Sequence, residues 1–547
     1  MQTTMMDLPL STQMILRHGA RIHATSRAGT YDGNQFCFAS FAQIAGRAEA
    51  LAAALAALGT EPGNRVATYC WNHQSHLETY LAVPAMGAIL HTLNVRLLPE
   101  HVTGIMADAE DRTLIVDDSL LAQIAPLLSR VPTLRNVIVV GTHDPRASGQ
   151  VPANLAVHGY DALLGAQTGS FTWPDLDERT AAVVCYTSGP TGEPKGVVYS
   201  HRSIFLHTLG TLGRDTFGIS QHDRILLLPP MFHANAWGLP FSAWFAGADL
   251  LLPGPHLKAA DIRTMVQQER PTFTALVPTL INDLLQSDRT DPQDMSSFRM
   301  IVSGGSAVSP ALIDAVRKRW GVPVLQGWGM TETSPMCCLS IPPRECRSDE
   351  EPAWRAKSGR PVPGMEVRLV DAGGVPLPND GATVGELQLH GPWVTGTYHR
   401  RSSPESFTRD GWLRTGDVGT IDAGGYVQIT DRTKDVIKSG GEWISSVELE
   451  AKLSAYAGVV EVAVIGIPDP RWEERPLVLV VQHPDARTTP HELREFLRPQ
   501  VARFALPESF AFVPELPKTS VGKIDKQELR KRVAAGRIDI VVDNRRT

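Results

Sequence analysis

Hydrophobic residues recur at helical spacing near the start of the chain. Between Ser40 and Gly59 they fall on one face of a helix, because they are three or four residues apart. Ser40 is a favourable N-cap residue and Gly59 is favourable at the C-terminal end of a helix. The pattern therefore predicts an amphipathic helix over this segment. A second helical stretch is predicted over residues 76–86. The apolar positions of the first helix are Phe41, Ile44, Ala48, Leu51, Leu55 and Leu58.

Short, unbroken apolar runs lie between such helical stretches. A strand that is covered on both faces is apolar at nearly every position, and helices cover both faces of parallel sheets. The alternation of these runs with helical patterns therefore predicts layered α/β structure with largely parallel strands. The runs span residues 66–70, 114–117, 137–141, 181–186, 225–228, 273–277 and 300–302.

The pattern changes at about residue 366. Segments 366–370, 385–390 and 426–430 alternate apolar with polar residues, which is typical of antiparallel strands with one solvated face. After residue 431 the chain has a separate succession of helix, strand and helix. We therefore predict a large domain over residues 1–431 and a small domain over residues 432–547.

Composition limits the class of protein. A chain of 547 residues is too long for one hydrophobic core, and its net charge of −6 without a basic tail argues against a nucleic-acid partner. The six cysteines have no regular pairing, which is typical of free thiols in a reducing compartment. No secretion signal and no apolar run of about 20 residues is visible, so a cytoplasmic protein without a transmembrane segment is expected.

The first motif with candidate chemistry spans residues 186–197, YTSGPTGEPKGV. A strand leads into a loop of hydroxyls, glycines and Lys195. Glycines let the backbone approach an anion, and successive N–H groups and hydroxyls can surround phosphate oxygens. The loop is not the common P-loop, because Lys195 follows Pro194 instead of a glycine. A surface turn rich in glycine and proline would have the same composition.

Four further motifs follow in the chain. They are QGWGMTETSP at 326–335, LRTGD at 413–417, DRTKDVIKSGGEW at 431–443 and PKTSVGKIDK at 517–526. In this order the five motifs resemble the acyl-adenylate-forming, or AMP-binding, superfamily, and the resemblance covers essentially the whole chain. Segments 231–240 and 439–446 are most similar to bacterial medium- and long-chain fatty-acyl-CoA synthetases.

This resemblance implies a fold and a reaction. The fold would be α/β, with two α/β layered subdomains and a small β-barrel in the large N-terminal region. A small α+β C-terminal domain would be joined to it by a hinge at Lys434. A carboxylic acid, expected to be a medium- or long-chain fatty acid, would attack ATP in the presence of Mg²⁺ to give an acyl-adenylate. Coenzyme A would then take the acyl group. A homodimer is compatible with the resemblance.

The resemblance also assigns roles to individual residues. Thr187 and Glu332 would ligate Mg²⁺ through oxygen, which this hard cation prefers. Asp417 would accept hydrogen bonds from the ribose hydroxyls. Lys523 would bridge the substrate carboxylate and the α-phosphate, and so oppose the repulsion between them. The other residues expected at the nucleotide are Ser188, Gly189, Thr191, Gly192, Lys195, Gly305, Ser306, Gln326, Gly327, Thr331, Arg432, Lys434, Lys438 and Trp443.

Two residues of segment 231–240 are candidates on the acyl side. Trp237 would gate the acyl tunnel and His233 would act in catalysis, although either could also be a structural residue of the core. One position departs from the family pattern. Pro190 stands where relatives usually have threonine, which removes a hydroxyl and a backbone donor from the phosphate loop.

Several other functions remain open at this point. The acid could be short, aryl or sulfur-containing, or the acyl group could pass to a carrier protein instead of coenzyme A. A serine hydrolase would need Gly-x-Ser-x-Gly, and GGSAV at 304–308 does not match it. A non-catalytic binding module would bind ATP without turnover, and the presence of both Glu332 and Lys523 argues against that class.

Overall fold

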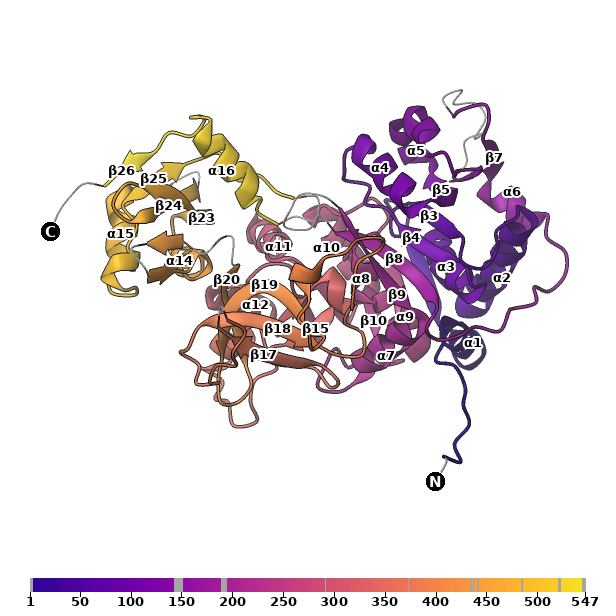
Figure 1. The fold of residues 1–547 in the computed structure, drawn as a ribbon, viewed down its shortest axis with the longest axis horizontal. Helices are drawn as coiled ribbons and strands as arrows, with labels where there is room; N and C mark the ends of the chain where they lie inside the picture. The colour runs from indigo at the N-terminus through magenta and orange to yellow at the C-terminus, as the bar shows by residue number, and fades with distance from the viewer. Residues whose placement is uncertain are drawn as a thin grey trace.

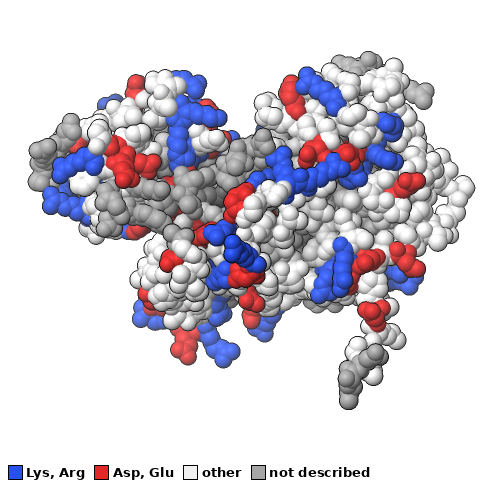
Figure 2. Space-filling view, in the orientation of Figure 1, with Lys and Arg blue, Asp and Glu red and all other residues white. Residues whose placement is uncertain are grey.

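The structure is a computed structural model. It describes residues 3–141, 151–187, 194–290, 292–371, 373–432, 435, 437–439, 442–483, 486–519 and 523–543. For residues 289, 290, 432, 438, 442 and 443 it describes the backbone alone. A large body contains the N-terminal and central parts of the chain, and a smaller C-terminal unit stands beside it (Figure 1). Figure 2 shows basic and acidic side chains interspersed over this face of both units.

The first subdomain is built on a seven-stranded sheet in the order β7-β6-β5-β3-β4-β8-β9. All neighbours in this sheet are parallel except β8 and β9, which are antiparallel. The strands are β3 (Arg65–Tyr69), β4 (Ile89–Thr92), β5 (Asp111–Asp117), β6 (Asn136–Val140), β7 (Ala156–Gly159), β8 (Ala181–Thr187) and β9 (Lys195–Ser200). The helices of this part are α2 (Phe41–Ala57), α3 (Gln74–Ala85), α4 (Pro99–Ala109), α5 (Asp118–Ile124) and α6 (Tyr160–Gly165).

The second subdomain is built on a nine-stranded sheet in the order β16-β15-β14-β13-β12-β10-β11-β1-β2. Its central strands are parallel, and β2, β15 and β16 pair antiparallel at the edges. The strands are β1 (Arg27–Tyr31), β2 (Phe36–Ser40), β10 (Arg224–Leu226), β11 (Asp249–Leu252), β12 (Phe273–Leu276), β13 (Met300–Ser303), β14 (Val324–Gly329), β15 (Met336–Leu339) and β16 (Arg360–Pro361). The helices are α1 (Thr12–Ile22), α7 (His201–Leu212), α9 (Leu239–Ala246), α10 (Ala259–Glu269), α11 (Pro278–Thr290), α12 (Pro310–Trp320) and α13 (Glu351–Arg355).

A third, antiparallel sheet completes the large body. It has the order β17-β18-β19-β20, with β17 (Glu366–Val370), β18 (Gly385–His390), β19 (Leu413–Ile421) and β20 (Val427–Arg432). Among the described residues β17 and β20 do not pair with each other, so the barrel expected here is an open four-stranded sheet in the part of the chain that the structure describes. β20 ends at Arg432, beside the predicted domain boundary.

The C-terminal unit has its own sheet and its own core. Strand β24 (Glu473–Gln482) lies centrally, between β25 (Ser509–Phe512) on one side and β23 (Val459–Asp469) on the other. Strands β21 (Ile437–Ser439), β22 (Glu442–Ile444) and β26 (Val541–Val542) complete the sheet, and helices α14 (Ser446–Leu453), α15 (Pro490–Leu497) and α16 (Lys526–Ala534) flank it. The α+β character expected of this unit is present.

The sequence pattern located the main elements well. The helix predicted from Ser40 is α2, in which the Ser40 and Gln43 side chains form a reciprocal capping box. The apolar runs form the parallel strands of the two large sheets, and the α/β fold class is confirmed. Among the described residues, no helix is both long enough and apolar enough to cross a membrane.

Candidate active site

The antiparallel pair β8 and β9 frames the predicted phosphate loop. Thr187 ends β8 and Lys195 begins β9, and the two residues face each other in register. Lys195 is 7 % exposed, and its Nζ lies 4.8 Å from the centre of the Tyr398 ring and 4.0 Å from Glu405 Oε1. The strand pair therefore holds both ends of the loop in fixed positions. Ser188, Gly189, Pro190, Thr191 and Gly192 lie outside the described residues.

A short turn, η2 (Thr331–Thr333), holds Glu332 beside the end of β8. The Tyr398 hydroxyl donates to Glu332 Oε1 over 2.8 Å, and Thr395 N donates to the Glu332 carbonyl over 2.8 Å. The Tyr199 hydroxyl donates to the Thr331 carbonyl over 2.7 Å. Burial and the nearby Glu332 carboxylate raise the pKa of Tyr398, so this phenol stays protonated as a donor. One hydrogen bond thus orients the Glu332 carboxylate, and the other two hold the backbone of the turn.

Thr187 and Glu332 fit the donor set that Mg²⁺ prefers. They offer a hydroxyl and a carboxylate, which are hard oxygen ligands, from two elements in contact. Tyr398 engages only one of the two Glu332 carboxylate oxygens. A divalent cation there would place positive charge beside the phosphates of a nucleotide.

Asp417 joins two motifs that are distant in sequence. It lies on β19 and is 3 % exposed, and its Oδ2 accepts a hydrogen bond from Trp328 Nε1 over 2.9 Å. Trp328 belongs to the 326–335 motif, next to Gly327 on β14. Arg432 is the cross-strand partner of Asp417 on β20. The third and fourth motifs therefore meet the second at one edge of the antiparallel sheet.

Gln326 positions a glycine-rich loop. Its Oε1 accepts a hydrogen bond from Val308 N over 2.7 Å, which ties the loop after β13 to β14. Gly305 in this loop has φ of 85°, a conformation that L side chains rarely adopt. Gly305 and Ser306 are exposed, as residues that bind a ligand must be. The side-chain oxygen of Gln326 thus has a partner within the protein.

Lys523 reaches this loop from the C-terminal unit. A Cβ atom added to Gly305 would lie 3.0 Å from Lys523 Cε, and one added to Gly304 would lie 2.9 Å from Cη2 of Trp237. Lys523 and Trp237 therefore lie over adjacent glycines. Lys523 itself closes a turn with Thr519: Thr519 N donates to the Lys523 carbonyl over 2.6 Å, and Lys523 N donates to Thr519 Oγ1 over 3.2 Å.

His233 is close enough to Lys523 for the two to interact electrostatically. Burial, then the positive charge of Lys523, then that of Arg96 lower its pKa to about 4. The ring is therefore neutral at physiological pH, and Lys523 and Arg96 supply the positive charge around it. A neutral imidazole near two cations is suited to hydrogen-bond an anion or its leaving group without adding charge. The structure thus brings four predicted residues, Lys523, His233, Trp237 and Gly305, to one place.

Some predicted residues are not located in detail. Lys434 lies outside the described residues, so its role as a hinge stays a prediction. Lys438 and Trp443 face each other across β21 and β22, and their side chains are not described. Arg96, Tyr398 and Tyr199 were missed by sequence reasoning, because single residues outside the motifs carried no local signal. Trp328 stood inside a motif and could have been noted there.

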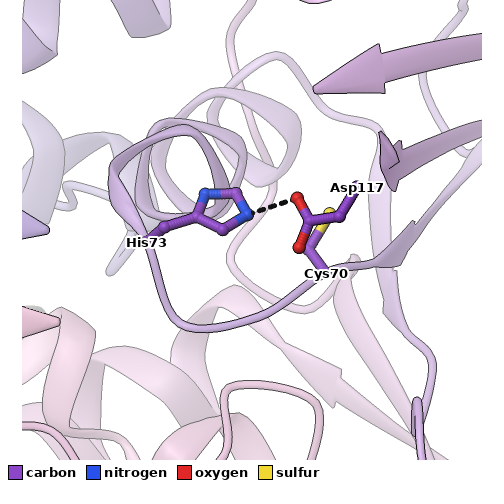
Figure 3. Close-up of side chains that lie close together, drawn as sticks. All are labelled: Cys70, His73 and Asp117. Atoms are coloured by element: carbon purple, nitrogen blue, oxygen red, sulfur yellow. Dashed lines mark hydrogen bonds and ion pairs between the residues drawn. The ribbon is translucent and has the colours of Figure 1, made fainter. Parts of the chain in front are cut away.

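A second cluster of possible metal ligands lies apart from these residues. Figure 3 shows Cys70, His73 and Asp117 close together at the start of α3. His73 Nδ1 accepts from His76 N over 3.2 Å, so its Nε2 donates to Asp117 Oδ1 over 2.7 Å. Cys70 Sγ donates to a backbone carbonyl, and burial raises the pKa of this thiol well above its usual value. These bonds use the atoms a metal would need, and we assign the cluster to anchoring α3.

Comparison with known proteins identifies the class. A family model described as AMP-binding enzyme matches residues 17–399, and a second, for the AMP-binding enzyme C-terminal domain, matches residues 448–523. The chain belongs to the AMP-binding enzyme family. Among solved structures, an anthranilate CoA ligase in complex with anthranoyl-AMP has a TM-score of 0.86 and 27% identity, with 97% of this chain and 99% of that chain covered.

Relatives of nearly the same length are acid–CoA ligases. The long-chain-fatty-acid–CoA ligase of Thermus thermophilus is 41% identical, with 97% of each chain covered. The medium-chain-fatty-acid–CoA ligase of Ectopseudomonas oleovorans is 39% identical, covering 96% of this chain and 97% of its own. The 3-methylmercaptopropionyl-CoA ligase of Ruegeria pomeroyi is 38% identical, covering 96% and 98%. The resemblance stated from the motifs is confirmed.

Proposed function

We propose that this protein is an ATP-dependent ligase that activates a medium- or long-chain fatty acid as its acyl-adenylate and transfers the acyl group to coenzyme A. One observation carries the proposal: Lys523 of the C-terminal unit lies over Gly305, next to His233 and Trp237. A cation at this point can contact both a carboxylate and an α-phosphate, which otherwise repel each other.

The residues divide the first step among them. The carboxylate attacks the α-phosphorus of ATP, pyrophosphate leaves, and Lys523 offsets the negative charge on the oxygens that react. Asp417 would accept from the ribose hydroxyls, while Lys195 and the loop from residue 188 would hold the departing phosphates. Mg²⁺, held by Thr187 and Glu332, would supply further positive charge at the phosphates.

The second step needs a different arrangement at the same site. The thiol of coenzyme A attacks the adenylate carbonyl and AMP leaves, so the space occupied by Lys523 has to become available. Rotation of the C-terminal unit about Lys434 would remove Lys523 and bring the β21–β22 hairpin, with Lys438 and Trp443, toward the nucleotide. A site that performs two chemistries in turn requires such a movable part.

A second candidate substrate is a short sulfur-containing acid. The observation that favours it is the 3-methylmercaptopropionyl-CoA ligase relative, whose 38% identity is almost that of the medium-chain ligase. Both candidate acids would undergo the same reaction. They differ only in the acyl group that the site beyond Trp237 would accommodate.

Pyrophosphate release tests the proposal. The full chain is assayed with Mg-ATP and acids from two to sixteen carbons, 3-methylmercaptopropionate and aryl acids, with and without coenzyme A. We expect release to be fastest with a medium- or long-chain acid and to require coenzyme A for sustained turnover. Maximal release with 3-methylmercaptopropionate would select the second candidate. Release that coenzyme A does not accelerate would contradict the transfer step and indicate another acceptor.

Two further properties are proposed with this function. We propose a homodimer, because Met5, Met6 and Leu8 of the N-terminal arm are 79%, 87% and 61% exposed and Figure 1 shows the arm reaching away from the body. Light scattering of the full chain would test it, and a monomer would contradict it.

We also propose a cytoplasmic location, where the six free cysteines stay reduced.

A further inference from the structure

The backbone that carries Trp237 is left-handed. Ala234, Asn235, Ala236 and Trp237 have φ of 44°, 56°, 48° and 59°, and Gly238 follows with 77°. Left-handed conformations are unfavourable for L residues with a Cβ, and runs of them are rarer still. Asparagine tolerates this region best among non-glycine residues, whereas alanine and tryptophan do not. The turn 234–238 therefore needs contacts from outside itself to persist.

Packing holds the end of this turn. The ring of Trp237 rests on Gly304, and a Cβ at Gly238 would lie 2.6 Å from Cε1 of His207. His207 is buried, and its Nε2 accepts a hydrogen bond from Met336 N over 3.2 Å. The Trp237 ring therefore lies over Gly304, and the adjacent Gly305 lies beside Lys523. The start of the turn has to be held in another way.

Asn235 provides that second attachment. Its side chain is buried, at 2 % exposure, and its Oδ1 accepts a hydrogen bond from Cys185 Sγ over 3.7 Å. The Tyr80 hydroxyl, which donates to the Met231 carbonyl, lies 3.5 Å from the same oxygen.

Cys185 links the turn to the phosphate loop. It lies on β8, two residues before Thr187, and residues two apart on a strand point to the same face of the sheet. The Cys185 thiol also lies 3.4 Å from Thr92 Oγ1 of β4, which fixes its position on the sheet. A shift of β8 at the phosphate loop would therefore move the group that holds Asn235.

We propose that Asn235 is a positioning residue of the acyl site. Its hydrogen bond with Cys185 holds the left-handed turn 234–238, sets the orientation of Trp237 at the acyl entrance and couples that orientation to the strand that carries the phosphate loop. The proposal rests on the proposed function, since it assumes that an acid enters past Trp237. It adds two residues, Asn235 and Cys185, that act through Trp237 without touching the reacting atoms.

The variant Asn235→Gly tests the contribution of the Asn235 side chain to the acyl site. Glycine adopts the left-handed region freely, so the change removes the side-chain contact while the backbone stays permitted. We expect the KM for the acid to change by about fivefold, which is the effect of one hydrogen bond, and the chain-length preference to broaden. The KM for ATP should change by less than about twofold, because no nucleotide contact is lost. Pyrophosphate release over the acid series measures all three.

A second pair of variants keeps the test decisive should Asn235→Gly fold poorly. Cys185→Ala removes the donor and should change the acid profile in the same direction, whereas Cys185→Ser, which restores a donor, should recover part of the original profile. The double variant Asn235→Gly/Cys185→Ala should be no worse than either single variant, because both act through one bond. Additive effects of the two changes would show that Asn235 and Cys185 do not act through one bond, and would overturn the proposal.

Tyr69→Phe is the matched control. Like Asn235, Tyr69 is buried and makes a side-chain hydrogen bond, but its hydroxyl donates to the Val95 carbonyl without contact to Asn235. It should lower the melting temperature without changing the acid profile. The inference is overturned if Asn235→Gly leaves acid KM and chain-length preference unaltered, or if it lowers all rates in parallel with the melting temperature, as Tyr69→Phe would. Absence of acid-dependent pyrophosphate release in the unmodified chain would instead overturn the proposed function.

Discussion

Lys523 differs from Thr187, Glu332 and Asp417 because the C-terminal unit supplies it. Its aliphatic stem contacts the Gly305 loop, while its backbone belongs to a turn closed by Thr519 in the C-terminal unit. The charge is therefore present only while that unit stays against the large body. Its contribution should be specific to the step in which two anions meet.

Lys523→Ala should abolish adenylate formation, with a loss of on the order of 100-fold or more in the rate of ATP–pyrophosphate exchange. A chemically prepared acyl-adenylate should still be converted to thioester, since that step no longer joins carboxylate to phosphate. Lys531→Ala, on the exposed face of α16, is the control and should behave as the unmodified chain. Near-normal exchange by the Lys523 variant would remove this residue from the catalytic set.

Glu332→Gln isolates the charge of a carboxylate that the fold already orients. A glutamine oxygen can still accept from Tyr398, so the turn η2 should keep its shape. Loss of the anionic oxygen should reduce activity by on the order of tenfold or more, because hydrogen bonds and contacts of charged groups contribute about 1.5–3 kcal/mol. Activity should recover only partly as magnesium is raised. An unchanged magnesium dependence would show that Glu332 serves another purpose.

At the scale of elements, the acyl side depends on helix α7 as well as on the left-handed turn. His207 of α7 packs against Gly238 and accepts from Met336 N through Nε2. Burial lowers the pKa of His207 to about 3, whereas in the unfolded chain it would titrate near its usual value of 6.5. The neutral ring is therefore part of the folded core.

This buried histidine makes stability depend on pH. Below pH 6.5 the unfolded chain binds a proton at this position and the folded chain does not. His207 should thus reduce the free energy of unfolding by about 1.4 kcal/mol for each pH unit between pH 6.5 and about 3. His207→Gln keeps an acceptor for Met336 N but does not titrate, so its loss of stability between pH 6.5 and 4 should be shallower. Urea unfolding at several pH values measures the difference, and equal slopes would contradict it.

Local patterns predicted α2 and the parallel strands because their signals lie within a few residues. The capping box of Ser40 and Gln43 and the apolar run of β8 are examples. The contact of Tyr398 with Glu332 could not be predicted, because it joins residues 66 positions apart. Segment 234–237 has ordinary helix-forming residues, and its left-handed backbone is set by tertiary contacts that override local preference. The resemblance of the motifs to a known family identified most candidate site residues. Their arrangement in space could not be predicted from the sequence.

At the scale of the molecule, the interface between the two units contains a group of charges. Lys518 Nζ pairs with Glu461 Oε1 over 2.8 Å in the C-terminal unit, and both charges act on Asp283 of α11 in the large body. Burial and Glu461 raise the pKa of Asp283, and Lys518 opposes this effect. Lys518 therefore interacts favourably with both the Glu461 and the Asp283 carboxylates in the arrangement that places Lys523 over Gly305.

Lys518→Glu would put three carboxylates together and should weaken this arrangement. Because the charges are partly exposed, we expect ATP–pyrophosphate exchange to fall by about fivefold, and the loss to shrink in high salt. Conversion of prepared acyl-adenylate to thioester should be nearly unchanged. Lys531→Glu, an exposed charge reversal of the same kind, is the control. Equal loss in both half-reactions would contradict a role for this interface in the first step alone.

The delivery of Lys523 by the C-terminal unit also has a consequence for synthesis and breakdown of the chain. A ribosome makes Thr187, Glu332 and Asp417 well before it makes Lys523. An incomplete polypeptide, or one cut by a protease after residue 432, would contain Thr187, Glu332 and Asp417 but lack the lysine proposed to activate the acid. Such a fragment would bind ATP without converting it to AMP. Loss of the C-terminal unit would thus stop the consumption of ATP. It would not produce an enzyme that consumes ATP without forming thioester.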